Sequence, residues 1–152
     1  MERIAIGADH AGYALKGEIV RFLQASGYPV EDVGTHSEES VDYPDYALQV
    51  ARAVATGQAD LGILICGTGI GMSITANKVK GIRAAVATDG YMARMAREHN
   101  DANILCLGGR VLGTGSALDI VQAFLQSRFA GGRHAGRVNK IQALEQAPIA
   151  RT

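Results

Sequence analysis

A cysteine followed by alternating glycines lies directly behind a short apolar run. Residues 61–71 read LGILICGTGIG, with the thiol at Cys66 and glycines at Gly67, Gly69 and Gly71. Glycines let the backbone approach a ligand closely, and such a loop at a helix start directs several amides toward one point. That point suits a phosphate or a developing oxyanion, and the same setting raises the thiolate fraction of a cysteine. Cys66 is therefore a candidate nucleophile, or a base that removes a proton beside a carbonyl group.

Two other interpretations of this loop stay open on the residues alone. A Walker loop requires Gly-Lys-Ser/Thr, which the loop lacks. The dinucleotide pattern G-x-G-x-x-G requires glycine where Met72 stands, although Asp89 lies at a suitable distance to bind a ribose. A nucleotide-binding module without catalysis is thus one alternative. A plain helix-entry turn, with Cys66 as a small core residue, is the other.

Acidic and imidazole side chains follow two further segments. Asp9 and His10 come directly after an apolar run, where Asp9 could equally cap the next helix. His99 lies at the end of a helical segment, and Asn100 is expected to be the residue that ends it. A helix end favours a protonated imidazole, so His99 is a candidate general acid, or merely a C-terminal cap.

Two arginines near the end of the chain are one helical turn apart. Arg133 and Arg137, in GGRHAGR, place like charges on one helix face, which slightly destabilises a helix. A bound anion would offset this repulsion, and arginine holds phosphate through two parallel hydrogen bonds. A solvated basic segment is the alternative, as it is for Arg110 in LGGR.

Short apolar runs alternate with segments of helical period along the whole chain. Strands are expected at residues 3–7, 29–33, 61–66, 82–88 and 103–109. Helices are expected near residues 15–23, 44–54, behind the glycine loop, 91–99, 117–124 and 136–145. This alternation predicts an α/β fold with a five-stranded parallel sheet covered on both faces. Ligands bind beyond the carboxyl ends of such strands, where the glycine loop and its neighbours fall.

The composition narrows the class of protein. The 152 residues fit one domain, residues 1–152, and 15 basic against 15 acidic side chains argue against a broadly basic nucleic-acid-binding protein. Cys66 and Cys106 each end an apolar run; we expect both reduced, with Cys106 in the core, which indicates the cytoplasm. The N-terminus shows no signal-peptide pattern and no run reaches membrane-spanning length, so no membrane is expected. No His, Cys or Asp cluster has metal-ligand spacing, so no metal is expected.

Five segments form a specific combination. They read GADHAGYALK, VGTHSEESVDYPDYA, CGTGIGMSITANKVKGIRAA, EHNDANILCLGGRV and FAGGRHAGRV. Together they resemble ribose-5-phosphate isomerase type B, in a family that includes galactose-6-phosphate isomerase subunits, from Ile4 to about Ile141. The resemblance implies a Rossmann-like α/β/α sandwich and cofactor-free interconversion of ribose 5-phosphate and ribulose 5-phosphate. It also implies a homodimer or tetramer with active sites between subunits, and a C-terminal helix that reaches toward the partner.

The resemblance further implies roles for individual residues. Cys66 is expected to be the base that moves a proton between C1 and C2, Thr68 to pass protons between O1 and O2, and His99 to open the furanose ring. The backbone amides of residues 67–71 are expected to stabilise an enediolate. The implied substrate-binding positions are Asp9, His10, Tyr43, Gly67, Thr68, Gly69, Ile70, Gly71, Asn100, Arg110, Arg133 and Arg137, the last two as phosphate ligands.

The chemistry of this reaction agrees with the side chains present. It needs a base, oxyanion donors, an acid at the ring oxygen and a site for the remote phosphate, and it has no net redox step that would require nicotinamide. A six-carbon substrate, allose 6-phosphate or galactose 6-phosphate, is the alternative with the same mechanism. Galactose-type members are expected to need two different chains.

Overall fold

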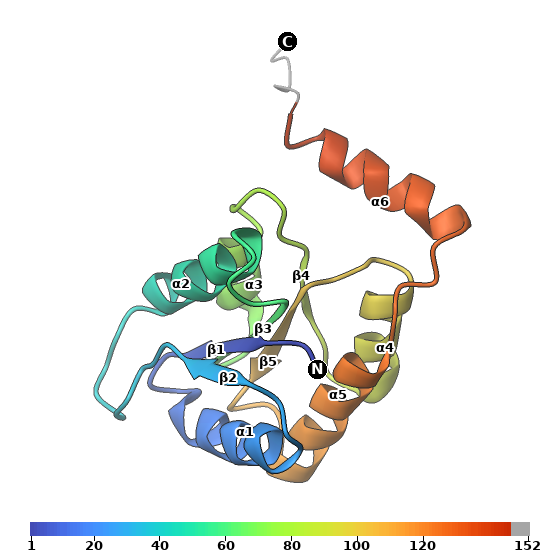
Figure 1. The fold of residues 1–152 in the computed structure, drawn as a ribbon. Helices are drawn as coiled ribbons and strands as arrows, with labels where there is room; N and C mark the ends of the chain where they lie inside the picture. The colour runs from blue at the N-terminus through green and yellow to red at the C-terminus, as the bar shows by residue number, and fades with distance from the viewer. Residues whose placement is uncertain (147–152) are drawn as a thin grey trace.

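The computed structural model describes residues 1–146 and contains one parallel five-stranded sheet (Figure 1). Its strands are β1 (Ile4–Ala8), β2 (Val30–Asp32), β3 (Leu61–Cys66), β4 (Ala84–Val86) and β5 (Ile104–Gly108). Their order across the sheet is β2-β1-β3-β5-β4. The three inner strands are buried along their whole length, as their continuous apolar runs predict. The α/β expectation is confirmed.

The two edge strands are shorter than the sequence predicts. β2 and β4 each pair with one neighbour through three residues, against the expected ranges 29–33 and 82–88. Side-chain bonds replace part of the missing ladder at β4, because Asn77 Nδ2 donates to the carbonyl of Ala84 at 2.9 Å and the Ala84 amide donates back to Asn77 Oδ1 at 2.8 Å. An edge strand closed in this way offers fewer free groups to another strand.

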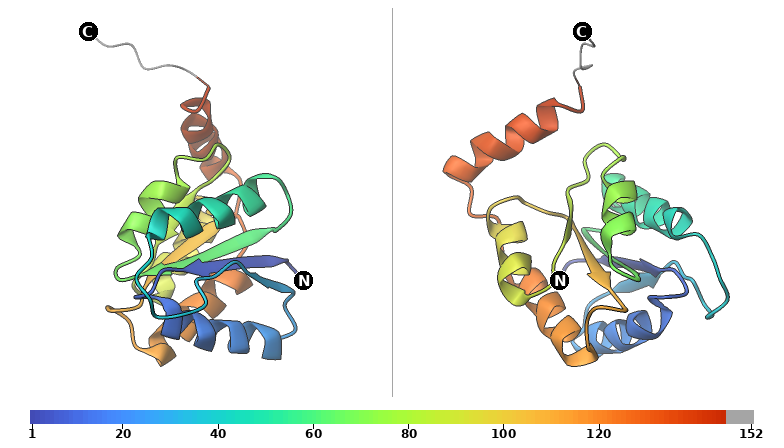
Figure 2. Two further views of the ribbon diagram at one scale, coloured as in Figure 1. Left: turned by 90° about the vertical axis from the view of Figure 1, so that its left-hand side faces the viewer. Right: turned by 180° about the vertical axis from the view of Figure 1, so that it is seen from behind.

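Helices cover both faces of the sheet (Figure 2). One face carries α1 (Tyr13–Ala25), α4 (Gly90–Glu98) and α5 (Thr114–Gln126), which pack around the fully buried Phe124. The other carries α2 (Tyr43–Ala55) and α3 (Ile70–Ala76) around Met72. Cys106 lies in this second core, where burial raises the pKa of its thiol. The expectation that Cys106 lies in the core is confirmed.

The last helix, α6 (Arg133–Ala143), projects away from the sandwich (Figures 1 and 2). It begins three residues earlier than the expected residue 136, because Gly131 and Gly132 take positive φ values of 65° and 55° and end the preceding segment. Its first turns contact the body through the buried His134 and Val138. Pro148, before which the helix was expected to stop, lies outside the described residues.

None of the helices in residues 1–146 combines the length and the apolar character needed to cross a bilayer.

Candidate active site

Cys66 ends β3 and lies almost entirely out of solvent, with 6% of its surface exposed. The backbone amide of Gly69 donates a hydrogen bond to Cys66 Sγ at 3.1 Å. A donor at this distance stabilises negative charge on sulfur. The thiol is therefore built into the loop rather than merely packed in the core.

The glycines of the loop are required by their close neighbours. Gly69 has a φ of 83°, and a Cβ there would lie 3.0 Å from the Leu107 carbonyl carbon. A Cβ on Gly71 would lie 2.4 Å from Tyr43 Cε1, so the tyrosine ring packs directly on the loop. Only glycine fits both positions without a shift of the backbone or the ring.

The loop amides are partly used within the loop. The Gly69 amide serves Cys66 Sγ, and the Ile70 amide donates to Thr68 Oγ1 at 3.2 Å. The expected oxyanion hole over residues 67–71 is therefore not a set of five open donors. An oxyanion that uses the Ile70 amide has to displace the Thr68 hydroxyl.

Asp9 and His10 lie at the carboxyl ends of the strands, as Cys66 does, because they directly follow β1. Asp9 is buried, and its Oδ1 accepts from the amides of Ala11 at 3.0 Å and Gly12 at 3.2 Å. These contacts hold the turn before α1, whose N-cap is Gly12 without a side-chain hydrogen bond, so the expectation that Asp9 caps the helix is not confirmed. His10 Nδ1 accepts from the Val41 amide at 3.2 Å, which leaves Nε2 of a neutral ring to carry the proton.

Arg110, in the turn after β5, completes this group. The Arg110 amide donates to the Gly67 carbonyl at 3.0 Å, and a Cβ on Gly67 would lie 3.6 Å from Arg110 Nη1. The guanidinium thus lies against the glycine loop. Together these residues form what we call the thiol cluster: Asp9, His10, Tyr43, Cys66, residues 67–71 and Arg110.

His99 and Asn100 lie at the amino ends of the strands, opposite to the carboxyl ends where Cys66 lies. α4 starts beyond the carboxyl end of β4 and runs back, so its last residues are beside the amino ends of the strands, where the Gly62 amide donates to the Asn103 carbonyl at 2.9 Å. β3 is six residues long and separates this edge from Cys66 by roughly 17 Å. Within one chain, His99 and Asn100 therefore cannot act on a molecule bound at Cys66.

The residue that ends α4 differs from the prediction. His99 is the C-cap, and the left-handed residue is Asp101, with a φ of 48°, rather than Asn100. The sequence signal was ambiguous because asparagine and aspartate both tolerate this conformation.

A histidine that the sequence did not single out lies against His99. The ring of His134, on α6, stacks on the His99 ring with 4.1 Å between centroids and 12° between planes. Burial lowers the pKa of His134, and charge on His99, Arg133 and Arg137 lowers it further. The four-residue spacing of His134 and Val138 was the available signal for a buried position on this helix.

Arg133 and Arg137 are exposed on the same helix, one turn apart as predicted. With His99, Asn100 and His134 they form what we call the imidazole cluster. A groove of about 530 Å³ lies next to it, between α6 and β4. Its lining residues are Asn77, Ile82, Arg83, Ala84, Ala85, Asn100, Ala102, Ile141, Leu144 and Glu145.

Other site types find little support in residues 1–146. No group of three or more His, Cys, Asp and Glu side chains in this part of the chain is arranged to hold a metal ion. Asp89, the candidate ribose ligand, caps α4 instead, because its Oδ1 accepts from the Met92 amide at 2.8 Å.

The Ribose/Galactose Isomerase family model matches residues 4–141. The chain belongs to the ribose/galactose isomerase family. The resemblance expected from the five sequence segments is thereby confirmed.

Individual members are similar over almost their whole length. Ribose-5-phosphate isomerase B of Escherichia coli is 54% identical over 146 residues, which cover 96% of this chain and 98% of that protein. A Clostridium thermocellum ribose-5-phosphate isomerase B structure is 63% identical with a TM-score of 0.94, covering 95% of this chain and 97% of that one. The Mycoplasma genitalium ribose-5-phosphate isomerase B, solved with bound ribulose 5-phosphate, is 42% identical with a TM-score of 0.92, covering 96% and 97%. The family shares the five-stranded sandwich seen here.

Proposed function

We propose that this chain interconverts D-ribose 5-phosphate and D-ribulose 5-phosphate. Membership of the family and the close similarity to ribose-5-phosphate isomerase B support this activity. One observation carries the proposal. The Cys66 sulfur accepts a hydrogen bond from the Gly69 amide, and it does so at the carboxyl ends of the strands, where α/β proteins bind ligands.

Cys66 acts as the base in the proposed reaction. Its thiolate removes the proton from C2 of the open aldose, and the electron pair moves through C1 onto O1 to form an enediolate. Amides of the glycine loop and the Arg110 guanidinium stabilise the negative charge. The thiol then returns the proton to C1, while the Thr68 hydroxyl transfers a proton between O2 and O1. The oxidation levels of C1 and C2 exchange internally, so the reaction needs no cofactor.

A second chain supplies the remaining groups in this proposal. His99 protonates the ring oxygen of cyclic ribose 5-phosphate, Asn100 binds the sugar, and Arg133 and Arg137 hold the phosphate at the partner's thiol cluster. The separation of the two clusters by the length of β3 supports this arrangement. So does α6, which projects from the body (Figure 1) and on which both arginines are exposed. A homodimer is the smallest assembly with complete sites.

Both cysteines are free thiols in buried positions, which supports a cytoplasmic location for the enzyme.

Isomerisation by the wild type and by Cys66→Ala tests the function and the base together. With EDTA present, we expect rapid wild-type turnover of ribose 5-phosphate and a kcat lower by on the order of 10³-fold in Cys66→Ala. Cys106→Ala is the matched control and should keep the wild-type kcat, because Cys106 is buried in the core.

Three other results would change the proposed base, the proposed substrate or the proposed function. An active Cys66→Ala enzyme would move the base elsewhere, with Asp9 the next candidate. Higher kcat/KM on allose 6-phosphate or galactose 6-phosphate than on ribose 5-phosphate would replace the substrate and keep the mechanism. Absence of activity on all three sugars would overturn the proposed function.

A further inference from the structure

The turn that follows His99 and Asn100 is formed by a left-handed residue. Asp101, with a φ of 48°, is the one non-glycine residue with a positive φ among residues 1–146. The left-handed conformation costs an ordinary residue about 1 kcal/mol, so neighbouring contacts have to hold it. Asp101 directly follows His99 and Asn100, so contacts that hold it also hold the end of α4 from which both side chains project.

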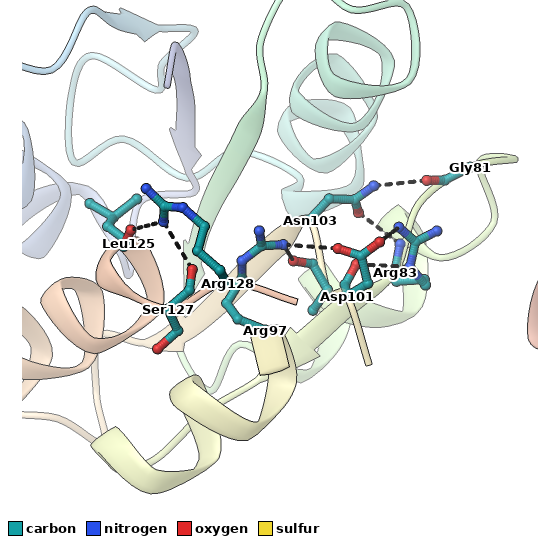
Figure 3. Close-up of polar contacts among 9 residues, drawn as sticks. Gly81, Arg83, Arg97, Asp101, Asn103, Leu125, Ser127 and Arg128 are labelled. Atoms are coloured by element: carbon teal, nitrogen blue, oxygen red, sulfur yellow. Dashed lines mark hydrogen bonds and ion pairs between the residues drawn. The ribbon is translucent and has the colours of Figure 1, made fainter. Parts of the chain in front are cut away.

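Two arginines hold Asp101 from opposite sides (Figure 3). Arg97 Nη1 lies 3.4 Å from Asp101 Oδ1, and Arg83 Nη2 lies 3.5 Å from Asp101 Oδ2. Arg83 Nε also donates to the Asp101 carbonyl at 2.8 Å, and Arg97 Nη1 donates to the carbonyl of Ala102. We call Arg83, Arg97 and Asp101 the arginine clasp.

The carboxylate of Asp101 balances charges that are largely removed from water. The side chains of Arg83 and Arg97 are 14% and 11% exposed. Burial lowers the pKa of Arg97, the charge of Asp101 raises it, and Arg97 Nε has no hydrogen-bond partner among the described residues. Without Asp101, two largely buried guanidinium groups would lose the carboxylate that they share, and Glu2 would be left to offset the charge of Arg97.

The clasp is anchored at both ends of the turn. The amides of Asp101 and Ala102 donate to carbonyls of α4, at 3.2 Å to Arg97 and 2.9 Å to Ala96. On the other side, the Arg83 amide donates to Asn103 Oδ1 at 2.8 Å (Figure 3). The turn is therefore fixed between α4 and the residue that precedes β4.

The backbone bonds of Asp101 and Ala102 already close the helix end, so the two arginines restrain Asp101 beyond what a helix end requires. Replacing a buried ion pair by apolar side chains of similar volume is often neutral or stabilising. An ionic clasp on a left-handed residue instead specifies one backbone path. The stacked ring of His134 holds His99 from the helix side, so both the backbone and the imidazole are restrained.

We propose that Asp101 is a positioning residue: held by Arg83 and Arg97, it sets the turn that directs His99 and Asn100 toward the partner's thiol cluster. This inference rests on the role of His99 in the proposed function. It extends the site by residues that do not themselves touch the substrate.

A double-mutant cycle between Asp101→Asn and His99→Asn tests the inference. Asparagine keeps the shape of aspartate and its tolerance of positive φ but removes the charge. We expect Asp101→Asn to lower kcat on ribose 5-phosphate by about 10- to 100-fold through misplacement of His99, with a smaller change in KM. On the His99→Asn background the same substitution should cause a much smaller loss of kcat, because one of its two targets is already absent.

The controls separate positioning from folding. Asp119→Asn removes an exposed carboxylate on α5 and should keep the wild-type kcat. Thermal unfolding shows whether each variant folds, and Asp101→Gly, which also accepts a positive φ, replaces Asp101→Asn in the cycle if the latter does not fold. If neither variant folds, Asp101 is required for folding itself, and the inference is overturned.

The remaining outcomes are also decisive. A wild-type kcat in Asp101→Asn, or an undiminished effect of it on the His99→Asn background, would overturn the positioning role alone. An inactive wild type would overturn the proposed function, and a fully active His99→Asn enzyme would overturn the role of His99. Either result removes the basis of the inference. Both are seen in the kcat of the wild type and of His99→Asn, before the double mutant is measured.

Discussion

Two cysteines on neighbouring strands differ through their surroundings. Cys66 and Cys106 belong to the same face of the sheet and the same core. Cys106 is fully buried, and burial followed by the charge of Cys66 raises the pKa of its thiol. Cys66 receives an amide hydrogen bond at the start of the loop. Residue type alone thus leaves the chemistry open, and the amide hydrogen bond is what distinguishes the proposed base, Cys66, from Cys106.

The stacked imidazoles predict a pH dependence of stability. The His134 ring faces the His99 ring, with Arg133 and Arg137 nearby, and the pKa of His134 is lowered. The unfolded chain then binds this proton more tightly than the folded one, so stability is lost as pH falls below the usual histidine value of about 6.5. We expect a smaller decrease in the free energy of unfolding between about pH 7.5 and 5 in His134→Asn than in the wild type.

Urea unfolding at constant protein concentration measures this difference, because the enzyme is expected to be oligomeric. His36→Asn is the matched control, since His36 is exposed. Equal pH slopes in wild type and His134→Asn would contradict the prediction.

At the scale of elements, the glycine loop derives its shape from a neighbouring strand. The spacing of the glycines indicated a ligand-binding loop, but not why each glycine is needed. The structure supplies the reason at Gly69, whose positive φ and contact with Leu107 exclude a side chain. The loop conformation and the placement of Cys66 therefore depend on β5 as much as on the loop itself.

Gly69→Ala and Gly57→Ala form a matched pair for this element. Both glycines have positive φ, but a Cβ on Gly57 meets nothing within 4 Å. Gly57→Ala should lower the free energy of unfolding by about 1 kcal/mol and keep the wild-type kcat. Gly69→Ala should cost about 2 kcal/mol more, through contact with Leu107, and should lower kcat by displacing the amide that serves Cys66. Equal stability and equal kcat in the two variants, measured by urea unfolding and isomerisation, would contradict this account.

At the scale of the whole molecule, the topology separates the two halves of the proposed site. The carboxyl ends of the strands carry the thiol cluster. α4 runs back toward the amino ends of the strands, and His99 lies at the end of this helix. α6 contacts the sandwich through His134 and then projects away from it (Figure 2). Under the proposed function, one chain presents two half-sites, and pairing of two chains would bring unlike halves together.

Mixed oligomers test this arrangement. Cys66→Ala and His99→Asn chains, each nearly inactive alone, should regain about one quarter of wild-type activity after joint refolding at equal amounts. Half of the dimers are then mixed, and each mixed dimer has one intact site. Mixing Cys66→Ala with Gly69→Ala is the control and should restore nothing, because both changes fall in the thiol cluster. Absence of recovery in the first mixture would place the complete site within one chain.

Much of the fold follows from short-range patterns. Apolar runs and helical period predicted the five strands and their helices, because backbone geometry and burial act over a few residues. Errors fell at the edges: β2 and β4 are shorter, since each has one partner, and α6 starts earlier, at a pair of left-handed glycines. The order of the strands was not predicted, since it depends on how long crossovers pack.

Local sequence also identified the candidate groups of the site, because cysteine, histidine, aspartate and arginine carry their chemistry wherever they lie. The combination of five segments was enough to indicate the family. Placement of these groups required the folded chain: His99 lies a strand's length from Cys66, His134 stacks on His99, and Asp101 takes the left-handed turn. Each of these depends on contacts between residues far apart in sequence. Packing of the whole molecule, rather than any local pattern, determines such contacts.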